Sequence, residues 1–284
     1  MKKRIILIGC GEIGSRHLQA LAKLSKPIDI EIIEPNDNAI VIAKQRLEEI
    51  AEFNKHTYFW YNSIDQIENQ SNLVIISTTA KNRVGIICNL LKQGHKKFFI
   101  EKMVCQTISE YILLMEEMEK RNAKCWVNLV RRYFPIYQKI KNIISQNNLT
   151  HISVIAGSNG LGTNAIHYLD LFMWLNNDYQ ISLDGTFLHN TIFPNKRGEG
   201  LVEFNGTIVG KTRKGQSINI TFVPESKSPI IINIENENDF LIFDEYLMKI
   251  FMKDFQIQQT NFKYEHVSTT TTKIVEDIFE KDEC

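Results

Sequence analysis

Short apolar runs alternate with amphipathic stretches along the first 130 residues of the chain. The apolar runs are typical of parallel strands buried on both faces, and the stretches between them carry apolar residues at helical spacing. We expect strands at 5–8, 28–33, 57–60, 73–77, 98–100 and 124–129, and helices at 15–23, 38–51, 83–92 and 109–121. This order predicts an α/β domain with a doubly wound parallel sheet, the Rossmann architecture.

After Pro135 the pattern changes to alternating apolar and polar positions, clearest in 217–222, which is typical of half-buried strands. Asn205-Gly206 lies between two apolar segments and predicts a hairpin turn. Further strands are expected at 230–234 and 240–243, and helices at 136–144 and around 275–279. We therefore expect an α+β C-terminal domain with a largely antiparallel open sheet. Its helix-free face predicts a homo-oligomer, a dimer or tetramer.

Three glycines follow the first strand at once in G-x-G-x-x-G spacing: Gly9, Gly11 and Gly14. The first permits a tight turn, the second lets the backbone approach a pyrophosphate, and the third lets helix and strand pack closely. Glu34 ends the second expected strand, where a carboxylate accepts hydrogen bonds from the adenosine ribose and repels a 2′-phosphate. The pattern predicts NAD as cofactor, in preference to NADP. A glycine turn that binds nothing is the alternative.

Composition limits the possible partners. The 284 residues suit two domains, and 33 basic residues balance 33 acidic ones, so no net charge favours nucleic acid. No apolar run approaches the ~20 residues of a membrane helix, and the run after Lys2-Lys3-Arg4 is too short for a signal peptide. Five cysteines without paired spacing are typical of reduced thiols. We expect a cytoplasmic protein with a small-molecule substrate and no metal, membrane or nucleic-acid partner.

A set of motifs in this order and spacing resembles the glucose–fructose oxidoreductase, inositol dehydrogenase and rhizopine-catabolism (Gfo/Idh/MocA) family. The resemblance covers nearly the whole chain. Its motifs are 5–17 including His17, 73–78, Gly94, Glu101-Lys102, 132–135, 167–170 before Trp174-Leu175, and Phe204-Asn205-Gly206.

The resemblance implies hydride transfer between a nicotinamide and a carbinol carbon. The substrate would be a sugar, cyclitol or sugar derivative, including nucleotide sugars and sugar acids. It places Lys102 near the nicotinamide and the reacting hydroxyl, and His167 as proton donor or acceptor on the first helix of the second domain. This assignment is chemically sound, because an ammonium can polarise an oxygen and an imidazole can move a proton near neutral pH.

Site residues follow from the motifs and from the expected strand ends. Two arginines in the substrate set hint at an anionic substrate. The domains are then 1–124, which binds NAD, and 125–284, which binds substrate and forms the oligomer. The expected cofactor contacts are Gly9, Gly11, Glu12, Ile13, Gly14, Glu34, Ser77, Thr78, Glu101 and Lys102, and the expected substrate contacts are Arg132, Asp170, Asn128 and Arg83.

The chain departs from the family pattern at several places. Met103 and Thr79 replace prolines, Arg83 replaces a histidine, and Thr163 replaces an acid four residues before His167. These departures leave two alternatives open: a non-catalytic NAD-sensing regulator on the same fold, and a reductase of a C=C or C=N bond. Because many family members are longer, we also expect some packing of a C-terminal helix on the cofactor domain to be missing.

Overall fold

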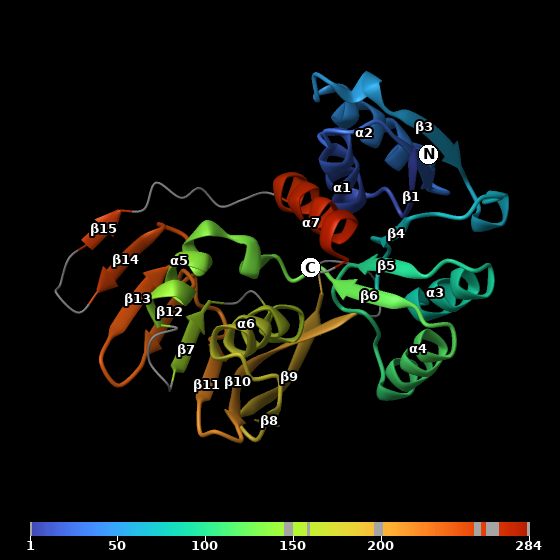
Figure 1. Cartoon of the computed structure of the whole chain (residues 1–284). Coiled ribbons are helices and arrows are strands. Elements are labelled where there is room, and N and C mark those ends of the chain that lie inside the picture. The colour runs from blue at the N-terminus through green and yellow to red at the C-terminus, as the bar shows by residue number, and fades with distance from the viewer. Residues whose placement is uncertain are drawn as a thin grey trace. The chain divides into compact units, whose positions relative to one another are not determined.

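The computed structural model divides the chain into two compact units (Figure 1). The first comprises Met1–Asn128 and Glu265–Cys284, and the second comprises Leu129–Tyr264. The structure describes residues 2–144, 150–157, 160–195, 201–252, 257–259 and 267–282. The division after Asn128 lies close to the boundary expected after residue 124. The return of residues 265–284 to the first unit differs from the expected domains.

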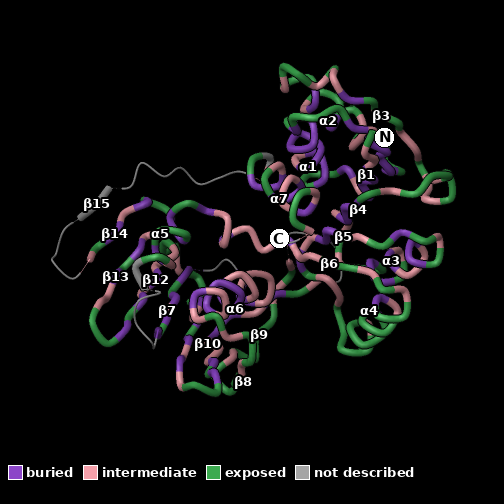
Figure 2. Tube along the Cα trace, viewed as in Figure 1, coloured by how far each residue is buried: buried purple, intermediate pink, exposed green. Residues whose placement is uncertain are grey.

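The first unit is built on a six-stranded parallel sheet. The strands are β1 (Lys3–Ile8), β2 (Ile28–Ile33), β3 (Thr57–Tyr61), β4 (Leu73–Ile76), β5 (Lys97–Ile100) and β6 (Lys124–Val127), in the order β3-β2-β1-β4-β5-β6. All five pairs are parallel. The central strands β1 and β4 are buried along their apolar runs (Figure 2), as a sheet covered on both faces requires. The predicted Rossmann architecture is confirmed.

Helices connect these strands in the expected order. They are α1 (Glu12–Ala22), α2 (Asp37–Glu48), α3 (Arg83–Lys92) and α4 (Ile108–Lys120), with short 3₁₀ turns at Phe53–Lys55 and Ile64–Gln66. α1 packs beside α2, and α3 packs beside α4. Each connection joins the carboxyl end of one strand to the start of the next. The loops that follow β1, β2, β4 and β5 therefore meet at one edge of the sheet.

The C-terminal helix α7 (Val267–Lys281) packs against α1 within the first unit (Figure 1). Ile274, Val275 and Ile278 are buried, and the Thr272 hydroxyl donates to the Ala20 carbonyl at 2.9 Å. The expectation that such packing is missing is therefore wrong, because the last helix packs on α1 of the first unit.

The second unit contains a nine-stranded sheet. Its strands are β7 (His151–Ala156), β8 (Ile181–Asp184), β9 (Leu188–Pro194), β10 (Val202–Thr212), β11 (Ser217–Phe222), β12 (Ile231–Glu235), β13 (Phe240–Asp244), β14 (Lys249–Met252) and β15 (Ile257–Gln259). They follow the order β15-β14-β13-β12-β7-β11-β10-β8, with β9 also on β10. β7 and β11 run parallel, and the other described pairs are antiparallel. This confirms the predicted α+β domain.

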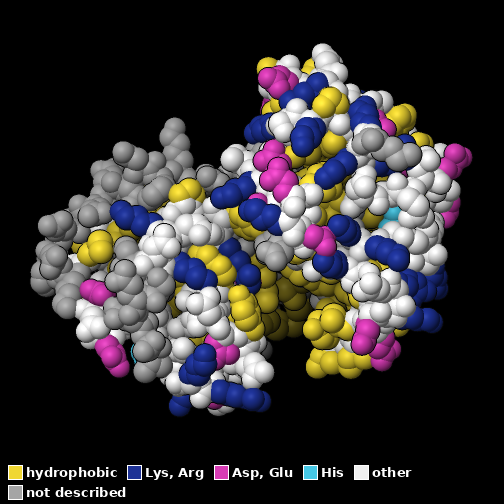
Figure 3. All heavy atoms as spheres, in the orientation of Figure 1, with side chains coloured by type: hydrophobic (Ala, Val, Ile, Leu, Met, Phe, Trp, Pro, Cys, Tyr) yellow, Lys and Arg dark blue, Asp and Glu magenta, His cyan; other side chains and the backbone are white. Residues whose placement is uncertain are grey.

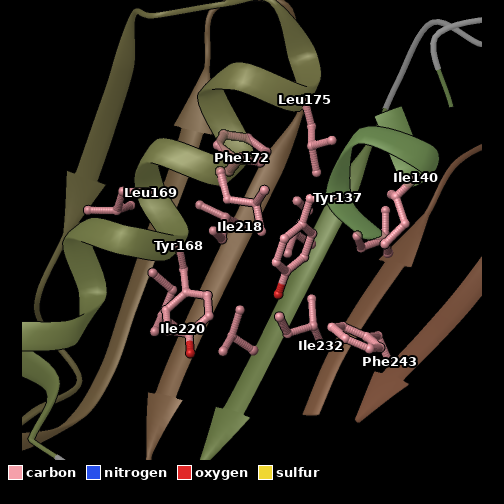
Figure 4. Close-up of a cluster of buried hydrophobic side chains, with 14 of the residues drawn as sticks. Tyr137, Ile140, Tyr168, Leu169, Phe172, Leu175, Ile218, Ile220, Ile232 and Phe243 are labelled. Atoms are coloured by element: carbon pink, nitrogen blue, oxygen red, sulfur yellow. The ribbon is translucent and has the colours of Figure 1, made fainter. Parts of the chain in front are cut away.

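One face of this sheet carries the core under α5 (Pro135–Ile144) and α6 (Leu161–Asn176). Figure 4 shows Tyr137 from α5 and Tyr168 and Phe172 from α6 lying over Ile220 and Ile232 of the sheet. Burial of these side chains stabilises the fold because each removes a large apolar area from water. A 3₁₀ turn, η3 (Val130–Tyr133), leads into α5.

The opposite face of the sheet, which we call the open sheet face, carries Ile155, Ile242 and Phe251. Strand register places these residues on the side away from the core, and their exposed fractions are 47%, 36% and 39%. Alternation along β11 buries Ile218 and Ile220 on the core side, as predicted. The sheet thus has apolar residues on both faces, but only one face has a covering helix among the described residues.

The hairpin predicted at Asn205-Gly206 is wrong. These residues lie inside β10, where the pairing with β9 shifts register between Phe204 and Gly206. Gly206 has φ +118°, a conformation that a β-bulge can require as well as a turn. The true connection to β11 follows Thr212 and contains Gly215 at φ +95°. The dipeptide indicated a positive φ, but not which kind of irregularity uses it.

Charged side chains of both signs are interspersed over the face shown in Figure 3. Apolar side chains gather over α4 in the same view, and the exposed residues there are Ile108, Tyr111, Ile112 and Met115, which we call the α4 stripe. Their spacing of three and four residues puts them on one side of the helix. Among the helices that the structure describes, none is long and apolar enough to cross a bilayer.

Candidate functional site

The glycine turn joins β1 to α1 and is closed on one side. Gly9 has φ +82°, and a Cβ atom placed on Gly14 would lie 2.0 Å from the Gly9 carbonyl oxygen. A Cβ atom on Gly11 would meet nothing within 4 Å. The fold itself therefore requires Gly9 and Gly14, whereas the Gly11 side of the turn is open to a ligand at the N-terminus of α1.

The Glu34 carboxylate is anchored beside this turn. Its Oε2 atom accepts from the Cys10 backbone N–H at 2.6 Å, and Oε1 accepts from the Asn36 N–H at 3.0 Å. The Ser77 hydroxyl supports the turn from β4 by donating to the Gly9 carbonyl at 2.6 Å. Burial, with the Glu34 charge, raises the pKa of the Cys10 thiol to about 12, so Cys10 is no nucleophile.

These features fit a nicotinamide dinucleotide. An open backbone at Gly11 precedes the first turn of α1, where Glu12 and Ile13 are exposed, and helix N-termini favour phosphate. The Glu34 carboxylate has acceptor sites beyond its two amide partners, as a ribose diol requires. Within the described ranges, no group of three His, Cys, Asp or Glu side chains could hold a metal ion.

Glu101, which follows β5, is the centre of a second cluster in the first unit. Its Oε1 atom lies 2.9 Å from His17 Nε2 and accepts from the Asn128 side-chain amide. His17 is fully buried, and its Nδ1 lies 2.9 Å from the Thr271 hydroxyl of α7. We call these four residues the Glu101 network. Burial alone would raise the pKa of Glu101, but His17, Asn128 and Arg83 together outweigh burial and hold this pKa below its usual value.

Lys102 is buried directly after Glu101, at the carboxyl end of β5. Arg83 lies beside it, only 2% exposed, and its guanidinium donates to the backbone carbonyls of Thr78, Glu101 and Met103. Arg83 and Asn128 are expected substrate contacts. Within the chain, Arg83 donates to backbone carbonyls and Asn128 donates to Glu101.

In the second unit, Arg132 and Asp170 are paired with each other. Arg132 Nε donates to Asp170 Oδ2 at 2.7 Å, and a second guanidinium nitrogen bonds the other oxygen. Burial raises the pKa of Asp170, although the bond to Arg132 acts against the rise. His167 lies half-buried on the same helix, three residues earlier. Two of the expected substrate contacts, Arg132 and Asp170, are thus paired with each other.

The N-terminus of α6 is bound by the Glu203 carboxylate of strand β10. Thr163, which stands where the family pattern has an acid, donates its backbone N–H to Glu203 Oε1 of β10 at 3.1 Å. Glu203 is buried and also accepts from the Asn195 amide at 3.0 Å. Gly160, the residue before the helix, offers no side-chain cap, so Glu203 satisfies this terminus instead.

A buried cluster around Arg131 escaped the sequence analysis. Arg131 Nε and one Nη donate to the Glu245 carboxylate at 2.8 and 2.9 Å, and Tyr137 and Tyr168 hydroxyls bond the same carboxylate. Burial alone would raise the pKa of Glu245, but the Arg131 guanidinium holds it below its usual value. The sequence has adjacent arginines at 131 and 132, of which only Arg132 belongs to the motif at 132–135, and nothing in the sequence shows which one is buried or that Glu245 is its partner.

Substitution at two glycines of the turn should separate ligand binding from folding. We expect Gly11→Ala to leave the unfolding midpoint nearly unchanged, since its Cβ position is open, and to weaken NADH binding at least about tenfold, ~1.4 kcal/mol. Gly14→Ala should lower stability by ~1–3 kcal/mol through overpacking against Gly9. NADH titration and chemical denaturation measure the two effects. Unchanged NADH affinity in Gly11→Ala would contradict this use of the turn.

Comparison with known proteins agrees with this geometry. Residues 3–129 match the GFO_IDH_MocA family model, described as "Oxidoreductase family, NAD-binding Rossmann fold". An inositol 2-dehydrogenase of Salmonella paratyphi B is 25% identical over 191 residues. This match covers 61% of the chain and 55% of the Salmonella protein, so the chain matches about half the length of this curated relative.

Solved structures share the fold over the whole chain. An Agrobacterium radiobacter oxidoreductase in complex with NAD+, L-tartaric acid and magnesium has a TM-score of 0.74 at 13% identity, covering 100% of this chain and 90% of that one. The super-repressor mutant of Gal80p from Saccharomyces cerevisiae has a TM-score of 0.74 at 14% identity, covering 98% and 84%. With the family match of residues 3–129, the resemblance seen in the sequence is confirmed. Through residues 3–129, the chain is similar to the NAD-binding Rossmann domain of the Gfo/Idh/MocA oxidoreductase family.

Proposed function

We propose that the protein is an NAD-dependent dehydrogenase that transfers hydride between the nicotinamide and a carbinol carbon of a sugar, cyclitol or sugar derivative. The observation that carries this proposal is the glycine turn, open at Gly11, with the Glu34 carboxylate anchored beside it. The inositol 2-dehydrogenase relative supports a polyhydroxylated substrate. Cys10, Cys88 and Cys105 are free thiols, which favours a reducing compartment such as the cytoplasm.

Different residues of the chain would bind the cofactor and act on the substrate. Gly11 and the first turn of α1 bind the pyrophosphate, Glu34 binds the adenosine ribose, and Lys102 polarises the reacting oxygen. His167 gives or takes the hydroxyl proton, a task suited to imidazole near neutral pH. The cofactor, when bound, supplies hydride chemistry.

A substrate screen tests the proposal. Purified protein with NAD or NADH is incubated with inositols, sugars, sugar acids and nucleotide sugars, and NADH fluorescence is followed. Turnover of a carbinol or ketone supports the dehydrogenase. Tight NADH binding without any turnover supports a regulator, a role compatible with the fold shared with Gal80p. Turnover confined to C=C or C=N substrates supports a reductase.

Glu34 should select NAD over NADP. The carboxylate repels a 2′-phosphate and accepts from the ribose hydroxyls, so we expect NADH to bind more tightly than NADPH. Glu34→Gln should lower NADH affinity about tenfold, as loss of charge-assisted hydrogen bonds worth ~1.5–3 kcal/mol predicts, and narrow the gap to NADPH. Titration of both cofactors measures this. Tighter NADPH binding by the wild type would refute the assignment.

We also propose self-association through the open sheet face, because Ile155, Ile242 and Phe251 expose apolar side chains there. Light scattering should give a mass at least twice 33.0 kDa at micromolar concentration. Ile155→Asp should shift the mass to that of a monomer. The matched control is Ile112→Glu on the α4 stripe, which is equally exposed and should leave the oligomer intact. If Ile112→Glu dissociates the oligomer and Ile155→Asp does not, the interface lies at the α4 stripe and not at the open sheet face.

A further inference from the structure

We propose that Arg83 is a positioning residue that fixes the backbone on both sides of Lys102, at the nicotinamide end of the cofactor. The inference rests on the proposed function, because it assigns Arg83 a part in placing the proposed catalytic lysine. It replaces the substrate contact suggested by the sequence. Arg83 begins α3 and is 2% exposed, so it is part of the interior of the first unit.

The Arg83 guanidinium donates hydrogen bonds to three backbone carbonyls, an arrangement that we call the Arg83 clip. One guanidinium nitrogen, Nη1, donates to the carbonyls of Glu101 and Met103, the two neighbours of Lys102 in the chain. The other, Nη2, donates to the carbonyl of Thr78, which follows β4. One planar cation thus joins the exits of two neighbouring parallel strands, β4 and β5. A guanidinium suits this task because its donors diverge in a rigid fork.

Two departures from the family pattern meet in this clip. The pattern has a histidine where the chain has Arg83 and a proline where it has Met103. A proline ring restricts its own backbone dihedral, whereas methionine does not. In this chain the Met103 carbonyl is bound by Arg83 instead, so a hydrogen bond supplies the restraint that a ring would give.

Lys102 is then held from two directions. On one side, the Glu101 carboxylate is bound by His17 and Asn128. On the other, Arg83 binds the carbonyls that flank the lysine. The glycine turn and Glu34, which serve the adenosine half of the cofactor, are bound by other groups. Loss of Arg83 should therefore disturb the nicotinamide end and spare the adenosine end.

The test compares two ligands on one variant. Arg83→Gln should weaken NADH binding about tenfold and change ADP-ribose binding less than about twofold, because ADP-ribose lacks the nicotinamide. In the active enzyme it should lower kcat by ~10–10² with little change in KM for the carbinol, since small displacements of a catalytic group cost that much. Arg83→Lys keeps the charge but not the fork, and should recover part of each loss.

The matched control is Val84→Ala, which removes buried volume from the next residue of the same helix without touching the carbonyls. It should lose stability and retain the wild-type ratio of NADH to ADP-ribose affinity. If Arg83→Gln does not fold, Arg83→Lys carries the same comparison. Equal weakening of both ligands, or no weakening of either, would overturn the proposal.

Failure of the proposed function would look different. A wild-type protein that binds NADH but turns over no substrate refutes the dehydrogenase, yet the comparison of NADH with ADP-ribose still decides the role of Arg83. A wild-type protein that binds neither ligand refutes both proposals.

Discussion

Replacing Lys102 or His167 with alanine should lower turnover by ~10²–10⁴ while leaving NADH affinity nearly unchanged. The expected size is that of a positioned group acting on a proton or a developing charge. Lys102 is buried just after β5, and His167 is half-buried on α6. We expect both alanine variants to keep the strand and the helix, because each change shortens one side chain and leaves the backbone hydrogen bonds in place. Steady-state kinetics with the substrate found in the screen, and NADH titration, measure the two quantities.

Each substitution has a matched control in the same unit of the fold. Lys97→Ala, at the start of β5, and His151→Ala, at the start of β7, remove the same side-chain types from exposed pairs with Asp282 and Ser217. Both should retain wild-type turnover. The double variant of Lys102 and His167 should lose less than the product of the single losses if the two groups serve one step. Full activity in either single variant would remove that residue from the proposed chemistry.

Breaking the Arg131–Glu245 pair should cost ~3–5 kcal/mol of stability, because the partner charge is left buried and unpaired. Arg131→Met and Glu245→Gln test the two sides, with denaturation midpoints as the measurement. Replacing both residues with methionine should recover much of the loss, since no charge is then stranded. The control Arg121→Met removes a pair within one helix turn, with Glu117, and should cost only ~0.3–0.5 kcal/mol.

The same pair should make stability depend on pH. Burial acts to raise the folded-state pKa of Glu245, but Arg131 and the hydroxyls of Tyr137 and Tyr168 together outweigh burial and hold this pKa below its ordinary value of ~4.3. Its contribution is therefore present above that ordinary value and is lost as the pH falls through the folded-state pKa. The stability difference between wild type and Glu245→Gln should shrink between pH 7 and pH ~3. A difference that grows with acid would contradict this reading of the pair.

Local pattern was enough to predict the first unit. Its strands are buried on both faces and its helices on one, so apolar runs and helical spacing report the structure directly. The glycine turn and Glu34 were also readable, because all their requirements lie within one strand, one turn and the next strand. The resemblance placed Lys102 just after the fifth strand, where the structure has it, and His167 on the first helix of the second domain, whereas the structure has it on α6, which follows α5 in the second unit.

Pairing between distant residues was decided only by the tertiary structure. Arg83 and Arg132 look alike in sequence, yet one is buried among backbone carbonyls and the other is paired with Asp170. Glu203 reaches α6 from a strand 40 residues away, and Thr271 of the last helix reaches His17. No periodicity records such contacts, because each depends on which strand ends and helices converge after folding.

Asn205-Gly206 shows that backbone conformation, like side-chain pairing, also depends on contacts with distant residues. The amino acids determine that a positive φ is available at Gly206, and a hairpin and a bulge both use it. The register of β10 against β9 selects the bulge. The amino-acid pattern alone therefore predicts the two domain classes and the glycine turn, because the interactions that form them join residues close together in the chain. The tertiary structure decided the partners of the buried charges, because a buried charge must find its counterpart wherever the fold brings one.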